Sequence, residues 1–113
     1  MILIDKASVL LENAVAVYLK RKCGGEIYYY KSTQTGIDID FYLPDEKCAI
    51  QVAYSLDTAE ERETKSLISF AKKAEEKHRL IIVTSEEERI ISKDGVTIEV
   101  IPIFRFLLGV QSA

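Results

Sequence analysis

The chain has 113 residues, of which 48% are hydrophobic and 29% are charged, and its formal net charge is −3. This length suits one hydrophobic core, and the composition excludes a disordered or a membrane-spanning chain. The N-terminal residues lack a basic secretory leader, and apolar runs such as 101–110 are too short to cross a bilayer. We therefore expect a single cytoplasmic domain over residues 1–113 that makes no membrane contact.

Zinc binding and tight nucleic-acid binding both lack support in the composition. The two cysteines, Cys23 and Cys48, lie far apart, and His78 is the only histidine. Zinc sites need closely spaced groups of such residues. A net charge of −3 also disfavours a strong, sequence-independent grip on phosphate backbones. We expect no zinc site and an exposed His78 without a partner.

The first predicted element is a helix that begins with a cap at Asp5 and runs to about Lys22, because apolar residues recur there at helical spacing. The sequence Cys23-Gly24-Gly25 ends it. Apolar residues cover so much of its circumference that we predict burial on more than one side. Glu12 is the only acidic residue between Asp5 and Glu26. Burying it without a partner would be costly.

Three strands are predicted next, over residues 26–31, 37–43 and 47–55, and their short connections favour an antiparallel meander. The middle strand alternates, so that one face carries Ile37, Ile39, Phe41 and Leu43. The other face carries Asp38, Asp40 and Tyr42.

The second half of the chain predicts a helix, a strand, a hairpin and a last short helix. A capping box at 58–61 opens the helix, which should end near Lys77. The apolar run 80–84 is typical of a strand covered on both faces. Asp94-Gly95 turns a hairpin between 89–92 and 96–101, and Pro102 begins the last helix. The predicted order is α-β-β-β-α-β-β-β-α, in the α/β class.

The turn at 44–46 determines which polar residues meet across the meander. If it closes symmetrically, Asp40 lies opposite Gln51 and Asp38 lies opposite Ala53. All four side chains would then share one face of the sheet. We expect a candidate active site on that face.

Several of these segments resemble a known family. They are Leu11-Glu12-Asn13, residues 36–41 and residues 50–55, and they resemble the PD-(D/E)XK nuclease-like domain at the C-terminus of certain prokaryotic AAA-type ATPases. The resemblance extends to 81–84 and 101–108. It implies a restriction-endonuclease-like core, with a mixed central sheet flanked by helices in the order αβββαβ, followed by a hairpin strand and a short helix. It also implies that the chain is the C-terminal fragment of a longer ATPase, whose GxxxxGK[ST] phosphate-binding motif does not occur in it.

The resemblance assigns positions within a nuclease motif. Active members hold Mg²⁺ between two acidic residues and place a lysine two residues after the second. Asp40 matches the first acid, whereas Gln51 and Ala53 stand where the second acid and the lysine belong. Glu12 matches a helical glutamate that some members add to the metal site. The resemblance thus implies a degenerate site, with no cofactor in this chain beyond Mg²⁺ held weakly by Glu12, Asp38 and Asp40.

The function we expect is that of a catalytically degenerate accessory domain, which binds nucleic acid or docks to the upstream ATPase domain or another protein. The candidates for contacts with DNA are Lys20, Arg21, Lys22, Lys72 and Lys73, although such runs are also typical of solvated helix ends. Three alternatives stay open. The polar face could be solvated surface, the chain could be an active metal-dependent nuclease using Glu12, Asp38 and Asp40, or it could be a structural oligomerisation domain.

Overall fold

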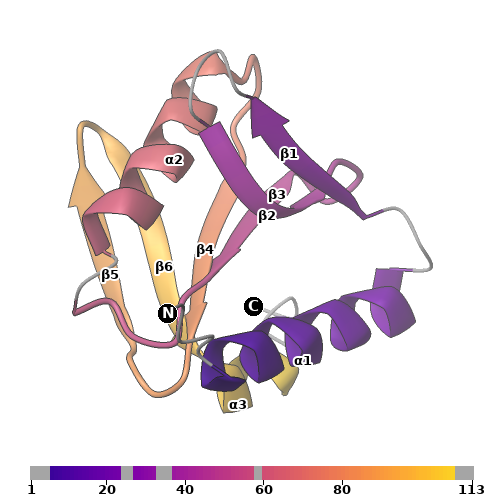
Figure 1. The fold of residues 1–113 in the computed structure, drawn as a ribbon. Coiled ribbons are helices and arrows are strands. Elements are labelled where there is room, and N and C mark those ends of the chain that lie inside the picture. The colour runs from indigo at the N-terminus through magenta and orange to yellow at the C-terminus, as the bar shows by residue number, and fades with distance from the viewer. Residues whose placement is uncertain (1–5, 24–26, 33–36, 58–59, 109–113) are drawn as a thin grey trace.

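The computed structural model describes residues 6–23, 27–32, 37–57 and 60–108. These form one six-stranded sheet and three helices (Figure 1). In chain order the elements are α1 (Lys6–Cys23), β1 (Tyr28–Ser32), β2 (Ile37–Leu43), β3 (Cys48–Val52), α2 (Glu60–Lys73), β4 (Arg79–Thr84), β5 (Arg89–Lys93), β6 (Val96–Pro102) and α3 (Ile103–Leu107). The predicted order of elements is confirmed.

The sheet is mixed, with the strand order β1-β2-β3-β4-β6-β5. The predicted meander is confirmed, because β1 pairs antiparallel with β2, and β2 pairs antiparallel with β3. The strand β4 lies parallel to both β3 and β6, and the hairpin partner β5 forms the far edge. A parallel pair needs a long crossover connection, and α2 supplies it between β3 and β4.

Helices cover both faces of the sheet. On one face, α2 packs Leu67 and Phe70 against strand residues such as Ile82. On the opposite face, α1 and α3 pack Val15 and Phe106 in a second cluster (Figure 1). The strand β4 contributes to both clusters and is buried along residues 80–84. The prediction of a strand covered on both faces is therefore confirmed.

A β-bulge in β2 changes the predicted alternation. Tyr28 pairs with Tyr42 and Tyr30 pairs with Ile39, so β2 carries one residue more than β1 over this interval. An extra residue reverses the direction in which later side chains point. Ile37 and Ile39 accordingly pack in the cluster with α2, whereas Phe41 and Leu43 pack in the cluster with α1. All four are buried, but the prediction that they share one face is wrong.

The first helix is less buried than its composition suggests. Leu11, Val15 and Leu19 face the core, whereas Leu10 and Val17 are exposed. Within the described part of the chain, the prediction of burial on more than one side is therefore wrong. The second helix ends at Lys73, about one turn before the predicted Lys77. None of the described helices is long and apolar enough to cross a membrane.

Candidate functional site

The side chain of Gln51 bridges β2 and β3 where their backbone pairing ends. The paired residues run from Leu43↔Cys48 to Phe41↔Ile50, and the same register places Asp40 opposite Gln51. There the Asp40 N–H donates to Gln51 Oε1 at 2.8 Å, and Gln51 Nε2 donates to the Asp38 carbonyl oxygen at 2.6 Å. The predicted neighbourhood of Asp40 and Gln51 is thus confirmed. The amide continues the hydrogen-bonded ladder in place of backbone groups.

The side chain of Asp40 on β2 in turn binds the backbone of β3. Its Oδ2 accepts a hydrogen bond from the Val52 N–H at 2.9 Å. The pKa of Asp40 is raised from 3.8 to about 7. Burial is the largest cause, and the nearby charges of Glu63, Glu12 and Asp38 act in the same direction, whereas the hydrogen bond from the Val52 N–H lowers the pKa. The carboxyl of Asp40 therefore binds its proton more tightly than an ordinary aspartate does.

The acidic side chains nearest to Asp40 come from three elements. Glu63 of α2 is buried, and Arg62 Nη2 donates to its Oε2 at 3.3 Å. Burial is the main cause that raises the pKa of Glu63. Glu12 of α1 and Asp38 of β2 are exposed. The sequence analysis missed Glu63, although its place four residues before the buried Leu67 puts it on the inward side of α2.

Ala53 lies in the hydrophobic core. It is 7% exposed and belongs to the cluster that contains Leu56 and Leu67. Its N–H donates to the Val83 carbonyl oxygen at 3.0 Å. The position assigned to a nuclease lysine is thus surrounded by apolar side chains. Ile37 and Ile39 pack in the same cluster as Ala53, so Asp38 between them points to the other face of the sheet, and the prediction that Asp38, Asp40, Gln51 and Ala53 share one face is wrong.

Hydrogen bonds to the backbone occupy part of the oxygen ligands that a Mg²⁺ ion would need here. Mg²⁺ requires oxygen ligands that are free to coordinate it in near-octahedral geometry. The Gln51 oxygen accepts the Asp40 N–H, and one Asp40 oxygen accepts the Val52 N–H. Among the described residues, no group of three or more His, Cys, Asp or Glu side chains is placed to hold a metal ion.

The candidate nucleic-acid contacts do not form one surface. Lys20, Arg21 and Lys22 are exposed at the end of α1, and Lys72 and Lys73 are exposed at the end of α2. Because α1 and α2 cover opposite faces of the sheet, the two basic runs lie on opposite sides of the molecule (Figure 1).

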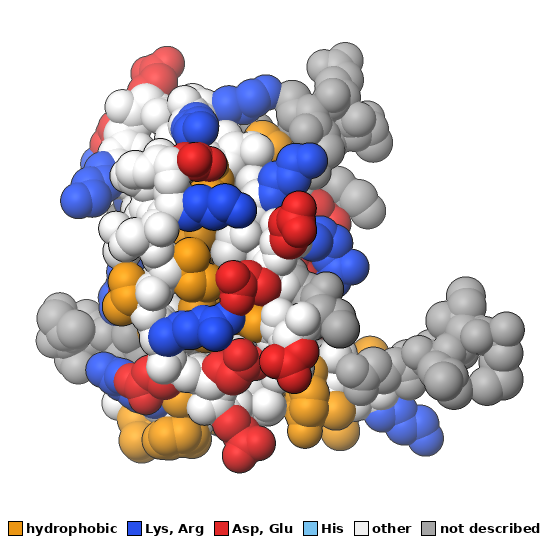
Figure 2. Space-filling view, turned by 90° about the vertical axis from the view of Figure 1, so that its left-hand side faces the viewer, with side chains coloured by type: hydrophobic (Ala, Val, Ile, Leu, Met, Phe, Trp, Pro, Cys, Tyr) orange, Lys and Arg blue, Asp and Glu red, His pale blue; other side chains and the backbone are white. Residues whose placement is uncertain are grey.

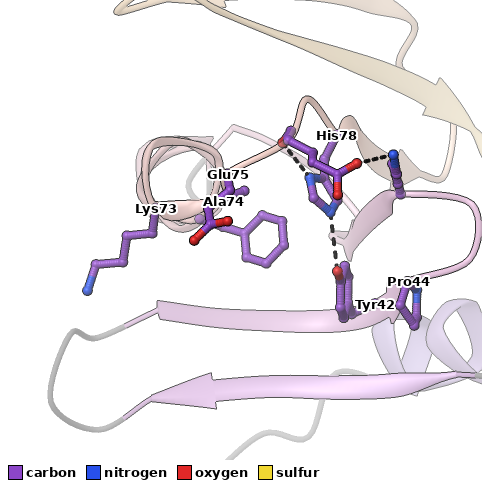
Figure 3. A pocket seen from close by; sticks show the side chains of 9 residues that line it. Tyr42, Pro44, Lys73, Ala74, Glu75 and His78 are labelled. Carbon is purple, nitrogen blue, oxygen red and sulfur yellow. Dashed lines mark hydrogen bonds and ion pairs between the residues drawn. The ribbon is translucent and has the colours of Figure 1, made fainter.

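A pocket of about 280 Å³ lies between the end of α2 and the β2–β3 turn, and Figure 3 shows its lining. His78 Nδ1 is 2.9 Å from the Glu76 carbonyl oxygen, so this nitrogen carries a hydrogen. In neutral His78, Nε2 then accepts from the Tyr42 hydroxyl at 3.2 Å. The Phe70 ring packs edge-on against both rings. The prediction that His78 has no partner is wrong.

The geometry defines an α/β domain in which the pairing of β2 with β3 is extended by the side chains of Gln51 and Asp40. One family model matches residues 8–106, and its description is Domain of unknown function (DUF4143). The chain belongs to this family. Neither the curated proteins nor the solved structures contain a match to the sequence.

Proposed function

We propose that this chain is a catalytically inactive, PD-(D/E)XK nuclease-like accessory domain of an AAA-type ATPase, and that it acts by docking to the ATPase or to another protein. The family is often found in AAA-ATPase-associated proteins. The order αβββαβ and the parallel β3–β4 pair agree with a restriction-endonuclease-like core. The observation that carries the proposal is the Gln51 amide, both of whose polar atoms bond to the backbone of β2.

The chemistry of phosphodiester cleavage explains why this observation disfavours an active nuclease. A metal-dependent nuclease needs ionised carboxylates at the cation and an activated water. Here the Asp40 carboxyl has a pKa of about 7, and its Oδ2 accepts the Val52 N–H. The Gln51 amide supplies no charge. Glu12 and Asp38 alone would leave a cation with exposed, solvated ligands.

Docking is better supported than nucleic-acid binding. The two basic runs lie on opposite sides of the sheet, and the net charge of −3 repels phosphate at long range. In contrast, several large hydrophobic side chains are exposed on α1 and α3. Exposed apolar patches are typical of protein interfaces.

A cleavage and binding assay tests the loss of activity. Single-stranded and duplex DNA are incubated with the chain and Mg²⁺ or Mn²⁺, and cleavage is followed on gels. No cleavage is expected, and calorimetric titration of Mg²⁺ should show no saturable site. Cleavage that needs the metal and disappears in Asp40→Ala would overturn the proposal.

The ATPase context has a separate test in the coding sequence around the chain. A GxxxxGK[ST] motif is expected in the same or the adjacent reading frame, because that motif cradles the phosphates of ATP. Co-purification of that ATPase with the tagged chain is then expected. An ATPase that does not associate with the chain would contradict the ATPase as the docking partner.

A further inference from the structure

The exposed apolar side chains of the described residues concentrate on two neighbouring helices. Six of the eight exposed large hydrophobic side chains lie on α1, on α3 or on the residue that directly follows α3, namely Val9, Leu10, Val17, Phe104, Leu107 and Leu108. We call these six residues the α1–α3 face. Leu10 is 68% exposed and Leu108 is 81% exposed. A cluster of this kind differs from the scattered single apolar residues that are normal on protein surfaces.

Helical spacing places these side chains away from the core. Leu10 and Val17 are seven residues apart and lie on the same side of α1, while Phe104 lies three and four residues before Leu107 and Leu108. The core-facing residues of the two helices are different ones. Tyr18 and Phe106 join the helices through an edge-to-face ring contact with a centroid distance of 5.1 Å. Figure 1 shows α1 and α3 side by side below the sheet, and Figure 2 shows two groups of hydrophobic side chains at this lower edge of the molecule, with an acidic side chain between them.

The part of the α1–α3 face that α1 supplies is positively charged. The helix α1 carries Lys6, Lys20, Arg21 and Lys22 against one acidic residue, Glu12. Arg105 of α3 is also basic and pairs with Glu88. The chain as a whole is acidic, with a formal net charge of −3. The α1 part of the face therefore attracts acidic groups, whereas on the α3 side the charge of Arg105 is balanced by Glu88.

This charge disfavours a second copy of the chain as the occupant. If α1 packed antiparallel against α1 of another copy, Lys20–Lys22 would approach the end of the helix that carries Lys6. The first turn of α1 contains no acidic residue to receive them. Like charges placed together across an interface oppose association.

The geometry favours a helix as the docking element. Both helices satisfy their own backbone and present only side chains, so the face offers no strand edge to an extended peptide. An amphipathic helix can instead lay apolar residues, spaced three and four apart, against two adjacent helices. Acidic residues at one end of such a helix would meet Lys20–Lys22.

We propose that the α1–α3 face binds an acidic amphipathic helix of a protein partner. The inference rests on the proposed docking function and specifies its partner. The apolar side chains of that helix contact Leu10 and Val17 on α1, Phe104 and Leu107 on α3, and Leu108 directly after α3. Its carboxylates lie beside the exposed ends of Lys20–Lys22.

The test uses two labelled peptides with leucines at identical helical positions. One peptide has glutamate and the other has lysine at all remaining charged positions, and binding to the full chain is followed by fluorescence anisotropy. The acidic peptide is expected to bind with a Kd of about 10–100 μM, because a small interface must offset the entropy of association. It should bind at least about tenfold more tightly than the basic peptide.

Matched variants locate the contact. Leu10→Ser and Leu108→Ser should each weaken binding of the acidic peptide by about tenfold, and Arg21→Glu should do the same. Ile90→Ser and Lys72→Glu are the controls, because Ile90 is exposed on β5 and Lys72 lies on the opposite helix. Both controls should bind the acidic peptide as the unaltered chain does.

Four outcomes would overturn the inference. They are the absence of binding to the acidic peptide, equal binding of both peptides, dimerisation in sedimentation velocity that Leu10→Ser abolishes, and pelleting with phosphatidylserine vesicles that Leu10→Ser abolishes. The failure of the inference differs from the failure of the proposed function. Loss of peptide binding without DNA cleavage leaves the inactive accessory domain in place, whereas metal-dependent cleavage removes it whatever the peptides do.

Discussion

At the residue scale, Gln51 is suited to its position because an amide offers a donor and an acceptor on one planar group. Its Nε2 donates to the Asp38 carbonyl oxygen and its Oε1 accepts the Asp40 N–H. An ionised carboxylate has only acceptors. An amide at position 51 therefore completes the pairing of β2 with β3, which a carboxylate there could not do.

We predict that Gln51→Glu lowers the free energy of unfolding by about 2–4 kcal/mol at pH 8, because it removes a buried donor and adds a second carboxylate beside Asp40. Urea denaturation followed by circular dichroism measures the change. Asn13→Asp, the same chemical change at an exposed position of α1, should stay within about 0.5 kcal/mol. Equal effects at the two positions would contradict the bridging role of Gln51.

Asp40 should make stability depend on pH. Its pKa is about 7 in the folded chain and 3.8 ordinarily, so the folded chain binds more protons than the unfolded chain between these values. The stabilisation is complete below about pH 4 and is lost as the pH rises through about 7. Because the side chain is half-buried, we expect a loss of about 1–3 kcal/mol between pH 4 and pH 8.

Asp40→Asn should abolish this part of the pH dependence, since the amide oxygen can still accept the Val52 N–H and carries no charge. The measurement is urea denaturation of both proteins at pH 4, 6 and 8. Parallel curves of stability against pH for the two proteins would show that Asp40 titrates normally.

At the element scale, the periodicity of apolar residues predicts the order of helices and strands. It does not predict which way the side chains of β2 point, because one extra residue in that strand reverses the alternation. Ile37, Ile39, Phe41 and Leu43 follow the alternation of an uninterrupted strand. The alternation does not reveal the bulge near Asp40, because a bulge arises in the pairing of β2 with β1, which lies elsewhere in the sequence. Apolar composition likewise cannot distinguish the buried Leu11 from the exposed Leu10. The sequence identifies Asp40 and Gln51 as neighbours, but not what they bond to.

Packing between α2 and the sheet gives a prediction at the same scale. Ala53→Lys places an ammonium group in the cluster that contains Leu56 and Leu67, and we expect a loss of at least about 3 kcal/mol. Tyr54→Lys is the control on the adjacent residue, which is exposed, and it should change stability by less than about 1 kcal/mol. Thermal denaturation measures both variants. An unchanged midpoint in the Ala53→Lys variant would show that this position opens to solvent.

At the scale of the whole molecule, one sheet serves two cores. Adjacent residues of β4 belong to different clusters: Ile82 packs toward α2, while Ile81 and Val83 pack toward α1. If the helices on one face of the sheet detach, they expose apolar residues of the same strands on which the helices of the other face pack. The two faces should therefore unfold together, as small domains usually do.

Tryptophan probes on the two faces test this coupling, since the natural chain has no tryptophan. Tyr18→Trp reports on the cluster with Phe106, and Tyr42→Trp reports on the cluster with Phe70. In each variant, the urea midpoints from fluorescence and from circular dichroism should coincide.

Phe106→Ala removes a buried ring from the α1 side and should lower the free energy of unfolding by about 3 kcal/mol. The probe at Tyr42, on the opposite face, should report that whole loss, because a cooperative sheet transmits it. If this probe keeps its original midpoint while the probe at Tyr18 shifts, the two layers unfold separately.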